Sequence, residues 1–156
     1  MEKKSILIVI LILIILLIIC VGFVDYNPFF KETFDVGDVT FDVPEGFHIE
    51  DNPGSSDIRI SNGVAPIFIG VLNDSDVKYH VSSYIVAKKD QNVSVNSTNY
   101  TVDDIIVYKV VANDTKANHI WFEFNNKTYY INTWGYHDKI DTTAFKLIDS
   151  IRLVDK

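Results

Sequence analysis

Cysteine is nearly absent from this chain of 156 residues, which contains only Cys20. Residues 25–156 therefore have no disulfide framework, and their stability must come from an apolar core. The sequence also lacks a glycine-rich phosphate loop, a Gly-x-Ser-x-Gly elbow and a Cys/His cluster. Those motifs carry nucleotide binding, nucleophilic catalysis and zinc binding. The sequence therefore predicts no catalytic residue, no cofactor site and no metal site.

Positive charge is also scarce. The chain has 14 Lys and Arg against 21 Asp and Glu, a net charge of −7, and a surface of this sign argues against a nucleic-acid partner. Two acidic pairs, Asp74 with Asp76 and Asp103 with Asp104, offer oxygen ligands for a hard cation. Neither pair belongs to a complete Asp-x-Asp-x-Asp-Gly loop, so we interpret both as turn or helix-cap residues. The histidines are widely spaced and suit no metal site: His48, His80, His119 and His137.

One long apolar run is present, at residues 6–24. Its 19 residues contain no charge and would span roughly 28 Å as a helix, close to the thickness of a bilayer core. No small-x-small cleavage pair follows it, so we expect an uncleaved transmembrane anchor. Lys3 and Lys4 precede the run, which predicts a cytoplasmic N-terminus. We therefore expect residues 1–24 to form the cytoplasmic tip and anchor in the cell membrane, 25–32 a short linker and 33–156 an extracytoplasmic domain.

From Thr33 onward, apolar and polar residues alternate with the period of a β-strand. Residues 33–43 read as a hairpin around Gly37, and a tight hairpin is expected at 125–127. Polar turns separate the other runs, which predicts an antiparallel meander. The expected strands are 57–61, 65–72, 92–95, 104–112, 119–125 and 128–136.

Two segments have helical features. Residues 73–90 fit a helix or a strand, but Asp74 or Ser75 as N-cap and lysines at the end favour the helix. Residues 141–151 place apolar side chains at helical spacing, with Asp141 as the expected N-cap. We therefore predict an α+β fold: an antiparallel sheet packed by a middle helix and a C-terminal amphipathic helix, preceded by one transmembrane helix.

Two short motifs carry a family resemblance. The stretch TFDVPEGF at 40–47 and the ending LIDSIRL at 147–153 resemble the entry and exit of the PsbP-like fold. The chain also resembles small membrane-anchored extracytoplasmic proteins of methanogenic archaea. The resemblance implies a central antiparallel sheet with helices packed on it, in an accessory or interaction module. It carries over no catalytic residue.

Aromatic residues gather near the last predicted strand. Tyr130, Trp134 and Tyr136 lie along it, and Trp121 lies on its hairpin partner. Alternation places Tyr130, Asn132 and Trp134 on one face of the sheet. If exposed, such aromatics could stack on sugar rings or anchor a partner protein. The alternative is that one face belongs to the core.

Asn-x-Ser/Thr triplets are more frequent than chance predicts. The composition gives an expectation of about 1.5 such triplets, whereas the chain contains six. We expect N-glycosylation of some of them in an exported domain. The stretch 92–101 is predicted as a solvent-facing loop with a short strand at its start, modified at one or two positions because neighbouring glycans would crowd. The candidate acceptors are Asn73, Asn92, Asn96, Asn99, Asn113 and Asn126.

These observations predict a membrane-anchored extracytoplasmic binding or accessory domain without catalytic activity. Its expected partners are the membrane, through the N-terminal helix, and a protein or another cell-surface component. Two alternatives remain open: a cell-envelope hydrolase that uses converging carboxylates, and an accessory subunit of a membrane complex.

Overall fold

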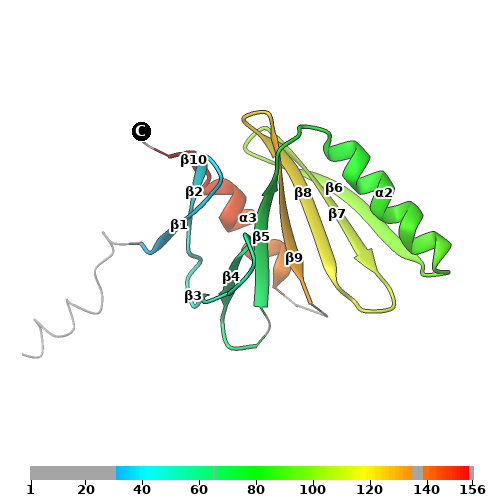
Figure 1. Ribbon diagram of the computed structural model, residues 1–156, viewed down its shortest axis with the longest axis horizontal. Helices are drawn as coiled ribbons and strands as arrows, with labels where there is room; N and C mark the ends of the chain where they lie inside the picture. Colours follow the sequence, from blue (N-terminus) through cyan, green and yellow to red (C-terminus); the bar gives the residue numbers. More distant parts are fainter. Residues whose placement is uncertain (1–30, 65, 135–138, 155–156) are drawn as a thin grey trace, which may run out of the picture. The chain divides into compact units, whose positions relative to one another are not determined.

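A computed structural model describes residues 31–64, 66–134 and 139–154 (Figure 1). The predicted membrane span at 6–24 lies outside the described residues, as do Tyr136 and His137. Among the helices that are described, none combines the length and apolar character needed to cross a bilayer.

Two antiparallel sheets form the domain. The larger has seven strands in the order β3-β4-β5-β9-β8-β7-β6, and the smaller has three in the order β1-β2-β10. The strands of the larger sheet are β3 (His48–Glu50), β4 (Ile58–Ser61), β5 (Pro66–Leu72), β6 (Val95–Val102), β7 (Ile105–Ala112), β8 (Asn118–Phe124) and β9 (Lys127–Thr133). The smaller sheet consists of β1 (Thr33–Val36), β2 (Val39–Asp42) and β10 (Arg152–Leu153).

The predicted α+β class and both helices of the domain are confirmed. The ambiguous segment forms helix α2 (Val77–Asp90), and the closing segment forms α3 (Ile140–Asp149). The expectation of one sheet is wrong, because the first hairpin pairs with β10 instead of joining the meander. Strands β3 and β10 were not predicted, since runs of 3 and 2 residues are too short to show a period.

The inner face of the large sheet carries the main core. On β8 and β9, alternation directs Ile120, Phe122, Tyr129 and Ile131 to this face, and all four are fully buried. The rings of Phe122 and Tyr129 stack with their centroids 5.7 Å apart. The small sheet adds Phe41, whose ring meets Tyr129 edge-on at 6.3 Å. Helix α3 covers the rest of this face with its apolar stripe: Ala144, Leu147 and Ile148.

The outer face of the same sheet carries a smaller core under α2. Val77 and Val81 of the helix pack against Val110 and Trp121, which belong to β7 and β8. Tyr84 adds to this cluster from the next helical turn. Helix α2 contacts β6, β7 and β8 and runs beside them along one end of the sheet (Figure 1). The α2 cluster is thus confined to one half of the outer face.

The helix starts differ from the predicted caps. Asp76 caps α2, since its carboxylate accepts a hydrogen bond from the Tyr79 backbone N–H at 2.9 Å. Helix α3 begins at Ile140 without a side-chain cap. Asp141 lies in its first turn and pairs with Lys109 Nζ at 2.6 Å. The N-cap assignments to Asp74 or Ser75 and to Asp141 are therefore wrong. The interpretation of the Asp74–Asp76 pair as turn or helix-cap residues is confirmed by Asp76, and acidic residues occupy both helix starts as the macrodipole favours.

Two hairpins use two-residue turns with left-handed backbone. Asp103 and Asp104 have φ of 42° and 67°, and Asn125 and Asn126 have φ of 48° and 59°. Two consecutive positive φ values are the signature of the type I′ turn, which Asn and Asp adopt more readily than most residues. The interpretation of Asp103 and Asp104 as turn residues is confirmed.

Docking of α3 on the inner face sets the stability of the domain. Leu147→Ala is expected to lower the free energy of unfolding by about 2–5 kcal/mol, because it opens a cavity at a fully buried site. Phe145→Ala, on the same helix at 47% exposure, should cost about 1 kcal/mol or less. Urea denaturation of both variants measures the difference. Equal losses would contradict the assigned core.

Candidate functional site

The half of the outer face beyond α2 carries polar and aromatic side chains in register. Arg59 of β4 lies opposite Phe68 of β5, and Phe68 lies opposite Asn132 of β9. The same row continues to Glu50 on β3 and to His119 on β8. Directly opposed residues on neighbouring strands share a face, so these five side chains emerge on one side of the sheet.

An aromatic patch, defined here as Phe68, Tyr130 and Trp134 with the neighbouring Arg59, occupies this half. The rings of Phe68 and Trp134 lie 5.0 Å apart, and the Arg59 guanidinium lies over the Phe68 ring at 6.0 Å. Arg59 Nε also pairs with a carboxylate oxygen of Glu50 at 2.7 Å. Trp134 is 73% exposed. The patch therefore presents the large Trp134 side chain to solvent. The ion pair with Glu50 holds the positively charged guanidinium of Arg59 beside it.

Tyr130 lies flat across the sheet because Gly70 gives it room. Gly70 is its direct neighbour on β5, and a Cβ atom at this position would meet the end of the Tyr130 ring and the Asp57 carboxylate. The Tyr130 hydroxyl donates to Asp57 Oδ1 at 2.6 Å. Burial raises the pKa of the Tyr130 phenol, and the Asp57 carboxylate raises it further. Tyr130 is therefore held as a neutral hydrogen-bond donor.

At the boundary between the aromatic patch and α2, side-chain rings of the sheet contact a ring of the helix. His119 contacts Tyr84 of the helix, with ring centroids 4.3 Å apart, and stacks on Trp121 at 5.6 Å. Burial lowers the pKa of His119, against an opposing effect of its hydrogen bond to Asn132. Trp121 is only 7% exposed. Its proposed role as an exposed interaction aromatic is therefore wrong, because α2 covers it.

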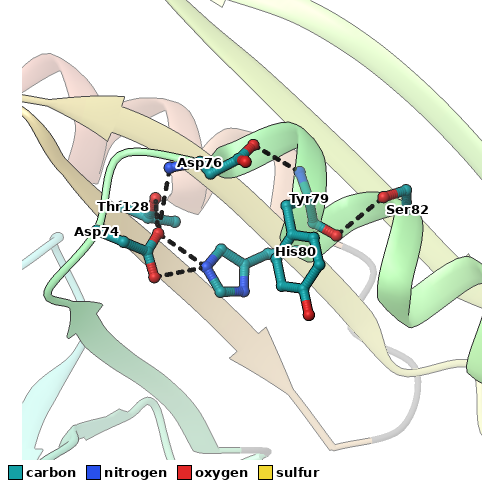
Figure 2. A network of polar contacts seen from close by, with 6 residues as sticks. All are labelled: Asp74, Asp76, Tyr79, His80, Ser82 and Thr128. Carbon is teal, nitrogen blue, oxygen red and sulfur yellow. Dashed lines mark hydrogen bonds and ion pairs between the residues drawn. The ribbon is translucent and has the colours of Figure 1, made fainter.

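A polar clamp fixes the start of α2 to the sheet (Figure 2). Both carboxylate oxygens of Asp74 lie 2.9 Å from His80 Nε2, one helical turn inside α2. Asp74 also accepts from the Thr128 hydroxyl at 3.3 Å, and the backbone N–H of Thr128 donates to the Asp74 carbonyl at 2.6 Å. The clamp thus joins the loop after β5, helix α2 and strand β9. The bond to His80 lowers the pKa of Asp74, against a smaller opposing effect of burial.

The Asp74–His80 pair is chemically the acid–base half of a hydrolytic triad. In the described part of the chain, the ring of His80 makes no hydrogen bond to a serine, threonine or cysteine. A nucleophile next to the base is what such chemistry requires. The bonds that the pair does make join the start of α2 to strand β9.

A cavity of about 580 Å³ opens beside the first turn of α2. Three acidic residues and one lysine are among those that line it: Asp76, Asp104, Glu123 and Lys78. Asp76 is engaged as the helix cap. Within the described ranges, no three His, Cys, Asp or Glu side chains gather as metal ligands. The wall is thus acidic, but it is no assembled coordination site.

A raised carboxyl pKa occurs elsewhere, at Asp103. Its hydrogen bond with Asp149, followed by the charge of that second carboxylate, raises the pKa of Asp103. Both residues are exposed, and neither belongs to the wall of the cavity. The perturbed carboxyl pair and the cavity therefore do not form one site.

All six candidate glycan acceptors are exposed asparagines. Asn73 follows β5, Asn92 follows α2, and Asn113 and Asn126 lie in turns. Asn96 and Asn99 lie within β6, so the expectation of a loop over most of 92–101 is wrong. Because Asn99 lies three positions after Asn96 on a strand of period two, their side chains emerge on opposite faces. The predicted crowding of two glycans at these positions therefore does not apply.

Sequence reasoning placed Tyr130 and Trp134 on a shared face but missed Phe68, Arg59 and Asp57. Their membership depends on the register of β4, β5 and β9, which sequence alone does not give. The alternation of Phe68 with the buried Ile67 and Ile69 was a usable signal. It indicates that Phe68 points away from the main core, as the structure shows.

Two antiparallel sheets, with one helix on each face of the larger, define the class of this α+β fold. Its architecture is similar to cyanobacterial PsbP (CyanoP) from Synechocystis sp. PCC 6803, with a TM-score of 0.51 and 10% identity over 83% of this chain and 95% of that one. A crystal structure from Bacteroides thetaiotaomicron VPI-5482 gives a TM-score of 0.45 and 11% identity, over 81% of this chain and 49% of the other. No family model and no curated protein matches the sequence. At these identities the likeness to CyanoP concerns the fold alone.

The clamp predicts a specific acid sensitivity. The pKa of Asp74 is lowered by folding, so the stabilising contribution of its carboxylate is complete above the ordinary aspartate pKa of 3.8 and is lost as pH falls through the folded pKa. Asp74→Asn should lower the free energy of unfolding at pH 7. It should also reduce the further decrease in this free energy when the pH is lowered. Urea denaturation at pH 7 and at about pH 3 measures this. The exposed Glu45→Gln is the control, and an unchanged acid response in Asp74→Asn would contradict the assignment.

Proposed function

We propose that this chain is a membrane-anchored extracytoplasmic binding or accessory domain without catalytic activity, which mediates protein or cell-surface interactions. The observation that carries the proposal is the aromatic patch around Trp134. The predicted anchor at 6–24 supports the extracytoplasmic setting.

The patch has the composition of a recognition surface. Interface hot spots are enriched in Trp, Tyr and Arg, and they lie on rigid supports that need little ordering when a partner binds. Here Phe68 and Tyr130 lie on paired central strands. Trp134 rests on Phe68 and leaves most of its surface free. A partner that covers Trp134 would bury apolar area without any rearrangement of the sheet.

The polar groups around the patch favour a partner with its own hydrogen-bonding groups. Arg59 and Glu50 form a half-exposed ion pair at one side, and Asn132 lies between Phe68 and His119 in the cross-strand row. Such a polar rim around an aromatic centre is the usual anatomy of a protein interface. Aromatic rings with adjacent amides and charges also suit sugar rings.

The alternatives make different demands. A cell-envelope hydrolase requires two carboxylates that converge on one bond. Under this alternative, they would be carboxylates that line the acidic cavity beside α2. An accessory subunit of a membrane complex would use the same patch on a neighbouring membrane protein. The patch favours binding because its exposed Trp134 ring rests on Phe68, the kind of supported aromatic side chain that protein interfaces use as an anchor.

Loss of the Trp134 side chain should remove the interaction. We expect Trp134→Ala to reduce partner capture by about tenfold or more, since a central aromatic anchor contributes about 2 kcal/mol or more. The measurement is crosslinking of the full chain in intact cells, followed by identification of attached proteins and glycans. Tyr79→Ala is the control, an aromatic at 61% exposure on α2. Equal capture by wild type and Trp134→Ala would overturn the patch assignment.

We also propose that some of the six acceptor asparagines carry glycans in protein from its natural source. Modification of a folded domain requires access to the asparagine and to the hydroxyl two residues later. Thr128, which completes the triplet of Asn126, has no exposed surface and is bonded within the clamp. Thr98 and Thr101, which complete the triplets of Asn96 and Asn99, are both exposed.

Occupancy should follow this accessibility. Glycopeptide mass spectrometry should find Asn96 and Asn99 modified more often than Asn126. The buried Thr128 hydroxyl is the reason for the difference. Higher occupancy at Asn126 would contradict the accessibility argument, and the absence of any mass excess over the unmodified chain would refute glycosylation.

A further inference from the structure

Strand β6 lies at one edge of the seven-stranded sheet. It has eight residues and pairs with β7 along its full length, from Val95 opposite Ala112 to Val102 opposite Ile105. Among the described strands none pairs with its other side. An edge strand directs about half of its backbone N–H and C=O groups outward, where they form a template for another strand.

The strand itself carries none of the sequence features that usually protect an exposed edge. In natural proteins, lysine, proline, a β-bulge or short length at an edge strand prevents its pairing with a strand of another molecule. The sequence VNSTNYTV has no charged residue and no proline. Its register with β7 is continuous and none of its residues has a positive φ. The opposite edge, β3, has three residues and includes His48 and Glu50.

Asn96 and Asn99 are the unusual residues of this strand. Asparagine is depleted in strands and favoured in turns. The other four acceptor asparagines lie in turns, bends or loops, where backbone conformation accounts for them, as the positive φ of Asn92 and Asn126 illustrates. Asn96 and Asn99 instead lie on the two faces of a regular edge strand, opposite Val111 and Tyr108. Local backbone geometry gives no reason for asparagine at either position.

We propose that β6 is a self-association edge, which pairs antiparallel with β6 of a second copy of the chain, and that glycans at Asn96 and Asn99 block this pairing. An antiparallel pair of identical strands is self-complementary about a two-fold axis, as a closed dimer requires. The chain carries a net charge of −7, and β6 is an uncharged stretch, so pairing of two β6 strands brings no like-charged side chains of the strand together. Glycans on both faces of the strand would keep a second strand away.

The glycan half of this inference rests on the glycosylation proposed above, whereas the pairing half does not. The two are therefore tested separately. The full-length chain is made without glycosylation, and Cys20→Ser removes its natural cysteine. Ser97→Cys then introduces a single thiol for crosslinking. Ser97 is exposed at the middle of β6, and the change preserves both acceptor triplets. A short bismaleimide should then give a crosslinked dimer, and Ser83→Cys on the exposed side of α2 is the matched probe.

We expect the Ser97 probe to give several-fold more dimer than the Ser83 probe. Thr101→Lys should reduce the Ser97 dimer several-fold because a charge on the edge opposes strand pairing. Ser83→Lys, which adds the same charge on α2, should leave it unchanged. Equal crosslinking at both probes, or an unchanged dimer with Thr101→Lys, would overturn the pairing. Capture of a different protein by the Ser97 probe in place of a dimer would also overturn it.

The glycan half is tested in a host that modifies these triplets. Glycosylated Ser97→Cys chain should lose the dimer, and Asn96→Gln combined with Asn99→Gln should restore it. A dimer that persists when both glycans are present would overturn the blocking role. An absence of glycans on the natural protein would refute the proposed glycosylation, while the unglycosylated crosslinking result would still decide the pairing.

Discussion

The burial of the inner sheet face is the constraint on which the rest of the structure depends. Tyr129 and Phe122 stack at its centre and are fully buried, so a second layer must cover them. A helix of 10 residues is too short to do this alone. The first hairpin therefore folds back to form the small sheet, and Phe41 reaches Tyr129 from it. The chain end completes this sheet through β10.

Covering the inner face in this way leaves the outer face to a single helix. The core under α2 contains few side chains, chiefly Val77, Val81, Val110 and Trp121. Polar contacts at both ends supplement it: the Asp74–His80 clamp at the start, and Lys88 with Asp114, 3.3 Å apart, near the end. Surface ion pairs stabilise weakly, so α2 is the less firmly held of the two helices. The aromatic patch is exposed because no second helix covers β5 and β9 in the described part of the chain.

Periodicity predicted the helices, most strands and the shared face of Tyr130 and Trp134, because each follows from local alternation. It could not predict that Trp121 is buried, since that depends on where α2 docks. It also failed at residues 96–101, where Asn, Ser and Thr have the composition of a loop. There the eight-residue pairing with β7 overrides local propensity. The patch partners Phe68 and Arg59 required strand register, which arises only from packing of the whole sheet.

The structure distinguishes two reasons for an asparagine in an Asn-x-Ser/Thr triplet, namely a special backbone conformation and a role as glycan acceptor, which look alike in the sequence. At Asn92 and Asn126 a left-handed backbone conformation explains asparagine without any glycan. At Asn96 and Asn99 the backbone is extended, and valine or threonine would suit it better. Asparagine has a low β-propensity, so strand formation does not explain its presence at two positions of this edge. Its side chain is the one that can carry a bulky hydrophilic group, and an edge is where such a group prevents pairing with a second sheet.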